Sequence, residues 1–165
     1  SLGRIHAGRL RHYAPHACAP YLKVRHQMDI ISLLGKKLKS VTINDLFEMY
    51  NVDVSYQYDR LEENVADNYS ASIDKLGLEF SFNTEQVLQT IFITSENSFE
   101  KINWFRSIRE VENYCHENAL SFEKGTSKFL GAFREWIKLY NFNCSIHYEF
   151  QDSTLRMVTL EAVGA

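Results

Sequence analysis

Proline, cysteine and long apolar runs are all scarce in this 165-residue chain. The only prolines, Pro15 and Pro20, lie near the start, and the three cysteines, Cys18, Cys115 and Cys144, are odd in number and widely spaced. Such cysteine usage argues against a disulfide framework and favours a reducing compartment. No apolar run approaches the roughly 18 residues that a membrane-spanning helix needs. We therefore expect a cytoplasmic, globular protein, as the hydrophobic fraction of 45% also indicates.

Acidic residues are absent from the first 27 positions, which carry five basic residues, four of the six histidines and both prolines. All 21 acidic residues follow, against 13 of the 18 basic ones, so residues 28–165 have a formal charge of −8 although the whole chain has −3. We predict that Met28 is the native start and that residues 28–165 form one acidic domain. Residues 1–27 are interpreted as a non-native basic extension, with a natural extension or a targeting peptide as the alternatives.

A charge of −8 bears on the class of partner. A nucleic-acid-binding surface must neutralise phosphates with Lys and Arg, so we expect no nucleic-acid partner. An acidic surface instead attracts cationic partners by long-range steering.

Catalytic and metal-binding motifs are also lacking. The sequence has no Gly-rich phosphate loop, no G-x-S-x-G and no H-E-x-x-H. Cys144 and His147 are an odd number of residues apart, which places them on opposite faces of a strand. We therefore predict no enzyme activity, no metal site and no cofactor. The alternative is a small enzyme or ligand-binding domain with a site near Cys144, His147 and Glu149, and a third possibility is an assembly subunit that pairs through a sheet edge.

The chain from Met28 predicts helices and then strands. "MDIISLLGKKL" is typical of a short amphipathic helix that stops near Gly35, and "SVTINDLFEMYNV" predicts a second helix with Thr42 as N-cap, ending near Asn51. Apolar alternation in "GLEFSF" and "VLQTIFIT", joined by the turn "NTEQ", predicts a β-hairpin.

The same order then recurs. Ser107 and Glu110 form a capping box before a helix that matches the earlier one at an offset of 65, and "SIHYEFQDSTLRMVTLEA" matches the hairpin at offsets of 68 and 67. "EWIKLYNF" adds a strand whose counterpart lies around Tyr69 to Ile73. We predict a single α+β domain whose antiparallel sheet is built from two helix-plus-hairpin repeats, with the helices packed on one face. The other sheet face carries Glu79, Ser81, His147, Glu149 and Arg156.

Between the first helix and the first hairpin lies the acidic segment "YDRLEENVADNYSASID". Complementary charge speeds encounter and fixes register between proteins, and aromatic anchors are enriched at interface hot spots. The predicted partner-binding residues are Asp59, Glu62, Glu63, Asp67, Asp74 and Trp104.

Together these segments resemble small bacterial immunity proteins of polymorphic toxin systems, including those of contact-dependent growth inhibition. The resemblance covers most of residues 28–162 and rests on "ISLLGKK", "LGLEFSF", "VLQTIFIT", "EWIKLY", "SIHYEF" and "LRMVTLEA". It implies a cytoplasmic, non-enzymatic inhibitor that forms a heterodimer with the C-terminal domain of one cognate toxin, commonly a nuclease, and covers its active site. Because a nuclease presents a positive surface to its substrate, the acidic domain fits this expectation.

Overall fold

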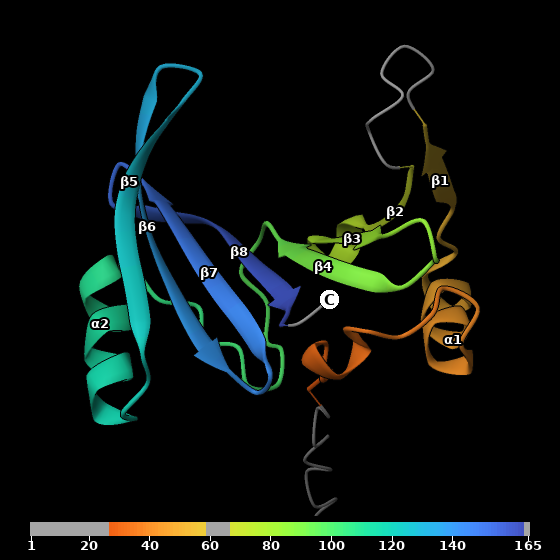
Figure 1. The fold of residues 1–165 in the computed structure, drawn as a ribbon, viewed down its shortest axis with the longest axis horizontal. Coiled ribbons are helices and arrows are strands. Elements are labelled where there is room, and N and C mark those ends of the chain that lie inside the picture. Colours follow the sequence, from red (N-terminus) through yellow and green to blue (C-terminus); the bar gives the residue numbers. More distant parts are fainter. Residues whose placement is uncertain (1–26, 59–66, 164–165) are drawn as a thin grey trace, which may run out of the picture.

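The computed structural model describes residues 27–58 and 67–163, in which short helices alternate with runs of strands (Figure 1). The first half contains the 3₁₀ helix η1 (Ile31–Leu33), the helix α1 (Val41–Tyr50), the strands β1 (Val54–Gln57) and β2 (Asn68–Ile73), the 3₁₀ helix η2 (Asp74–Leu76), and the strands β3 (Leu78–Phe82) and β4 (Leu88–Ile93). The second half contains the helix α2 (Ile108–Glu117) and the strands β5 (Phe122–Phe129), β6 (Ala132–Asn141), β7 (Cys144–Gln151) and β8 (Thr154–Ala162).

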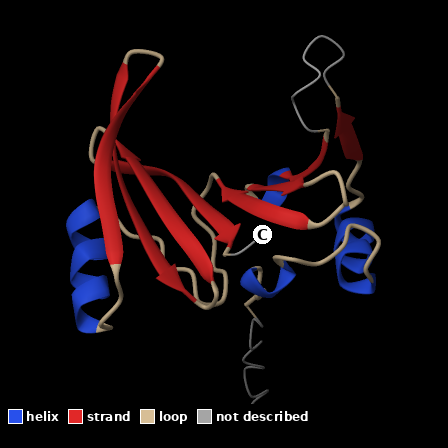
Figure 2. Cartoon of the chain, viewed as in Figure 1, coloured by secondary structure: helices blue, strands red, loops and turns tan. Residues whose placement is uncertain are grey.

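All eight strands join one antiparallel sheet in the order β1-β2-β3-β4-β8-β7-β6-β5. Strands β1 to β4 form one meander and β5 to β8 form another, and the two meanders meet where β4 pairs with β8. Figure 2 shows this arrangement as two groups of strands with a helix at each end of the sheet. The predicted single α+β domain with an antiparallel sheet is therefore confirmed.

One face of the sheet carries the core. Strand register aligns Phe80 with Ile91, Ile91 with Leu160, and Leu160 with Ile146, so these buried side chains share one face across both halves. On this face, Phe47 of α1 packs edge-on against Phe80, with 5.4 Å between ring centroids.

At the other end of the same face, Phe105 contacts both Tyr114 of α2 and Tyr148 of β7, at centroid distances of 5.4 and 5.2 Å. Tyr148 lies two residues after Ile146 on β7 and is buried on the same face. The two α-helices therefore cover one face of the sheet and leave the other open.

The expected first helix is much shorter than its pattern indicates. Only Ile31–Leu33 is helical, because the following backbone pairs with the sheet instead. The Gly35 N–H donates to the Leu88 carbonyl at 2.8 Å, and the Leu88 N–H donates to the Lys36 carbonyl at 2.9 Å. These bonds use backbone groups that a longer helix would need for itself.

The helix boundaries were only partly predicted. Ser40, not Thr42, is the N-cap of α1, whereas the end at Asn51 is confirmed by a left-handed residue with φ +52°. Ser107 is confirmed as the N-cap of α2, since the Glu110 N–H donates to the Ser107 hydroxyl at 3.3 Å, while the Glu110 carboxylate accepts from the Arg106 N–H at 2.8 Å.

The buried positions of α1 and α2 do not all lie at the offset of 65 found in the sequence pattern. Ile43 and Phe47 are among the buried residues that α1 directs at the core, and Val111 and Cys115 are those of α2. Val111 lies 68 positions after Ile43, and Cys115 lies 68 positions after Phe47. The same separation relates Leu78 and Phe80 of β3 to Ile146 and Tyr148 of β7.

Two strands, β1 and β5, were not anticipated. They are the two edges of the sheet, and neither shows a clear alternation of apolar residues: β1 is exposed throughout, and β5 reads "FEKGTSKF". An edge strand takes its position from hydrogen bonds to one neighbour, so its own sequence carries little pattern.

No helix in the described part of the chain is long and apolar enough to cross a membrane.

Candidate functional site

The open face of the sheet carries the polar residues that the alternation predicted. Glu79 aligns with Phe92, Phe92 with Thr159, and Thr159 with His147, all on the face opposite the core. Ser81 and Glu149 follow two residues after Glu79 and His147 on the same face. Arg156 is exposed and lies where the pairing of β7 with β8 shifts register.

At the end of this face formed by β1, β2 and β3 lies a hollow of about 300 Å³, which we call the acidic hollow. Its polar lining comes from strand pairing, because Ser55 lies opposite Ser70, and Ser72 lies opposite Glu79. The side chains that line it are those of Asp53, Ser55, Ser70, Ala71, Ser72, Asp74 and Glu79.

Three exposed carboxylates, those of Asp53, Asp74 and Glu79, converge on the acidic hollow, and no basic residue is among its lining residues. A second hollow of about 280 Å³ adjoins it and shares Ser72, Asp74 and Glu79. Carboxylates gathered on one surface without counter-charges create a negative potential that attracts cations and cationic proteins. The acidic hollow therefore carries negative charge that no residue of its lining neutralises.

The predicted partner-binding residues are only partly brought together. Asp74 lines the acidic hollow, whereas Asp53 and Glu79, its neighbours there, were not among the predicted residues. Asp53 follows α1 and precedes the edge strand β1. Because the sequence of β1 has no strand pattern, the sequence could not predict that Asp53 lies near Asp74. Asp59, Glu62 and Glu63 lie outside the described residues.

Trp104 lies elsewhere, in the connection between β4 and α2. It is half-buried, packs against the core, and lines a polar hollow of about 470 Å³ together with Ser98 and Lys101. None of the residues of that hollow lines the acidic hollow. Trp104 is therefore not part of the acidic surface.

Asp67 precedes β2 and accepts a hydrogen bond from the Tyr56 hydroxyl of β1. Tyr56 also packs against Tyr69, at 4.9 Å between ring centroids. The hydrogen bond to the Asp67 carboxylate stabilises the protonated phenol and is the main reason that the pKa of Tyr56 rises to about 12.

The Tyr56–Asp67 bond gives a testable titration. With Tyr56 at its raised pKa, its phenol is expected to stay protonated through the range near pH 10 in which an ordinary tyrosine ionises. Asp67→Asn removes the charged acceptor, so the midpoint of Tyr56 should fall toward 10. The measurement is a ¹³C NMR titration of the tyrosine ring, with Tyr56→Phe to assign the signal. An unchanged midpoint in Asp67→Asn would contradict the assignment.

At the other end of the open face, charges are compensated. Arg134 pairs with Glu149, and Lys138 pairs with Glu161 at 2.9 Å. These contacts join β6 to β7 and β8, so this part of the face offers little net charge to a partner.

Between these pairs, the ring of Trp136 meets that of His147 at 5.4 Å between centroids. Burial lowers the pKa of His147 and favours its neutral form. Gly125 of β5 leaves room for the indole, because a Cβ there would lie 2.7 Å from Trp136 Cζ2. The centre of this end is therefore aromatic and close-packed.

Cys144 and His147 do not form a catalytic pair. Cys144 is buried, its thiol donates to the Asn141 carbonyl at 3.1 Å, and burial raises its pKa to about 11. Strand alternation puts His147 on the opposite face of β7, and Glu149 is held by Arg134. A nucleophilic thiol needs a lowered pKa and an adjacent base, and this arrangement supplies neither.

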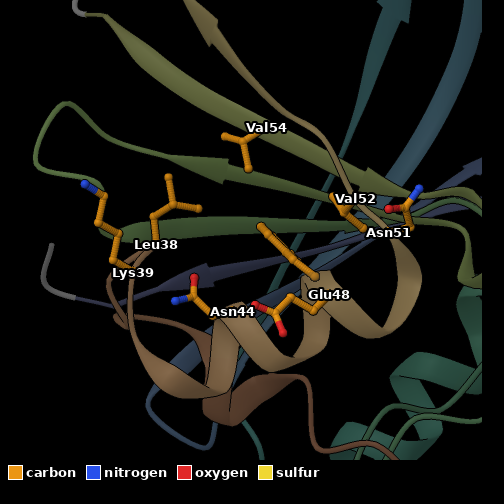
Figure 3. Close-up of a pocket in the computed structure, with 8 residues that line it drawn as sticks. Leu38, Lys39, Asn44, Glu48, Asn51, Val52 and Val54 are labelled. Carbon is orange, nitrogen blue, oxygen red and sulfur yellow. The ribbon is translucent and has the colours of Figure 1, made fainter.

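A further hollow, of about 340 Å³, lies between α1 and β1 (Figure 3). Asn44 and Glu48 extend from α1 beside Leu38, Val52 and Val54 of the neighbouring segments. Its only charged residues are Lys39 and Glu48, and it contains no histidine or cysteine. Within the described residues, no group of three His, Cys, Asp or Glu side chains could hold a metal ion.

The fold and this surface define an α+β protein with helices on one sheet face and an acidic hollow at one end of the open face. No protein-family model, curated protein or solved structure matches the chain.

Proposed function

We propose that this protein is a non-enzymatic immunity protein that binds and neutralises a cognate toxin domain by covering a basic active-site surface. A nuclease, which must present positive charge to its phosphodiester substrate, is the class of toxin that this surface fits best. The observation that carries the proposal is the acidic hollow, where Asp53, Asp74 and Glu79 converge without a basic residue.

The distribution of charge along the chain supports this proposal. Residues 28–94 contain 11 acidic and five basic residues, whereas residues 95–165 contain 10 and eight. Most of the excess negative charge therefore belongs to the half that contains the acidic hollow. A surface with this polarity would increase the rate of encounter with a cationic domain and help to orient it.

An inhibitor of this kind needs no catalytic constellation of its own. The buried, protonated thiol of Cys144 and the ion-paired Glu149 are consistent with structural roles. We infer further that the protein acts in the cytoplasm as one partner of a heterodimer. We also infer that its two halves are copies of one helix-plus-strands unit, since buried positions of the helices and of β3 and β7 recur at a separation of 68.

The test uses the toxin domain encoded beside the gene for this chain. Co-expression is expected to restore growth of cells that produce the toxin and to yield a 1:1 complex in gel filtration. Stopped-flow association should slow at least about tenfold between low and high salt, because steering between opposite charges is screened. Absence of a complex would overturn the proposal, and an association rate indifferent to salt would overturn the electrostatic docking.

A further inference from the structure

The β5–β6 hairpin extends away from the rest of the sheet (Figure 1). The residues at its tip are apolar. Its two-residue turn, Leu130–Gly131, has φ values of +47° and +82°, with Phe129 and Ala132 paired on either side. Leu130 is 92% exposed and Phe133 is 56% exposed.

This composition is unusual for such a turn. Glycine, asparagine and aspartate normally occupy turn positions with positive φ, because a Cβ is strained there. A leucine in this conformation, with its side chain in solvent, gains nothing from burial within its own chain. The hairpin tip is therefore an apolar projection without a described partner.

A second exposed apolar feature lies on the helical face of the first half. Helices η1 and α1 border a groove of about 440 Å³, within the size range of binding pockets. Val41 and Met49 stand on its rim and are 75% and 74% exposed. The lining residues are Met28, Asp29, Ser32, Leu33, Val41, Thr42, Asp45, Leu46 and Met49.

The two features carry opposite charges. Lys128 stands on β5 beside the hairpin tip, and Asp45 stands on α1 in the groove. Both are exposed, and neither has an ion-pair partner among the described residues. Asp29, the other carboxylate of the groove, is held by Lys101 at 2.8 Å.

We propose that the hairpin tip of one copy of this chain enters the η1–α1 groove of a second copy, with Lys128 facing Asp45. The tip cannot reach the groove of its own chain: α1 packs on β3, which is five strand spacings from β5, or about 24 Å along the sheet. A cationic toxin is a poor partner for the tip, because Lys128 beside the tip repels it. A copy of this chain offers both an apolar groove and an unpaired carboxylate.

The contact joins two different surfaces, which makes it heterologous. A single leucine and phenylalanine in a shallow groove bury much less than a standard interface of about 1,600 Å². Self-association is therefore weak, with dissociation constants on the order of 10 μM to 1 mM.

The test is sedimentation equilibrium of the full chain without any partner, so its failure is independent of the proposed toxin binding. The wild type should rise above its monomer mass of 19.3 kDa as its concentration approaches about 1 mM. Leu130→Asp places a charge on the apolar tip, and Met49→Asp places a charge on the rim of the groove. Each substitution should reduce self-association at least tenfold. Thermal unfolding of both variants checks that they remain folded.

A mixture of the two variants separates this contact from other modes of association. The Met49→Asp copy keeps its tip and the Leu130→Asp copy keeps its groove, so the mixture should associate more strongly than either variant alone. The exchange of charges gives a second check: Lys128→Glu and Asp45→Lys should each weaken self-association, and their mixture should recover it.

Three outcomes would overturn the proposal. The first is a wild type that stays monomeric at the highest concentration, and the second is a pair of variants that self-associate as strongly as the wild type. The third is a mixture of the two variants that associates no more strongly than either variant alone. The last result would indicate contact between two tips or two grooves, and the first would indicate that another molecule occupies the groove.

Discussion

Reversing the charges of the acidic hollow, in the triple variant Asp53→Lys, Asp74→Lys and Glu79→Lys, is expected to weaken binding of the cationic toxin domain more than about 100-fold. The three carboxylates line one hollow with no basic residue, so their fields add. Each reversal replaces an attraction by a repulsion. Because all three side chains are exposed, the variant should keep its stability to within about 1 kcal/mol.

The matched control is a second triple reversal, of Glu85, Glu96 and Glu117. These glutamates are exposed, make no ion pair among the described residues, and lie outside the acidic hollow. The control has the same net charge as the first variant, so a purely long-range effect would weaken both equally. Titration calorimetry at two salt concentrations measures both affinities. Equal losses, or no loss in the hollow variant, would rule out the hollow as the docking site.

Phe80→Ala is expected to lower the free energy of unfolding by about 3–5 kcal/mol. Phe80 is fully buried on β3, and its ring is packed edge-on by Phe47 of α1. The residue aligns with Ala71 on one side and Ile91 on the other, so no flexible surface can collapse into the space left by the ring. Its loss would therefore loosen α1 from the sheet as well as remove buried area.

Phe133→Ala provides the control for that prediction. The same atoms are removed from a side chain that is 56% exposed, so the expected loss is below about 0.5 kcal/mol. Urea unfolding of both variants at low concentration, followed by circular dichroism, gives the two free energies. Similar losses would mean that the α1–sheet packing contributes much less than burial of Phe80 indicates.

The sequence alone determined the fold class and much of the core. Alternation in "GLEFSF" and "SIHYEF" sufficed to predict β3 and β7, because one buried face imposes a period of two on a central strand. Ser107 and Glu110 sufficed to predict the start of α2, because a capping box is a local arrangement. The odd spacing of Cys144 and His147 likewise predicted their separation to opposite faces of β7.

Only the tertiary structure decided where the edge strands, the short helix η1 and the acidic hollow lie. Strands β1 and β5 are each placed by hydrogen bonds to one neighbouring strand. The segment after η1 forms backbone hydrogen bonds with Leu88. Neither kind of pairing leaves a periodic pattern in the sequence. Asp53, Asp74 and Glu79 span 26 positions of the chain and meet because β1, β2 and β3 lie side by side. Local patterns follow from local forces, whereas a surface that joins several strands depends on how they pair.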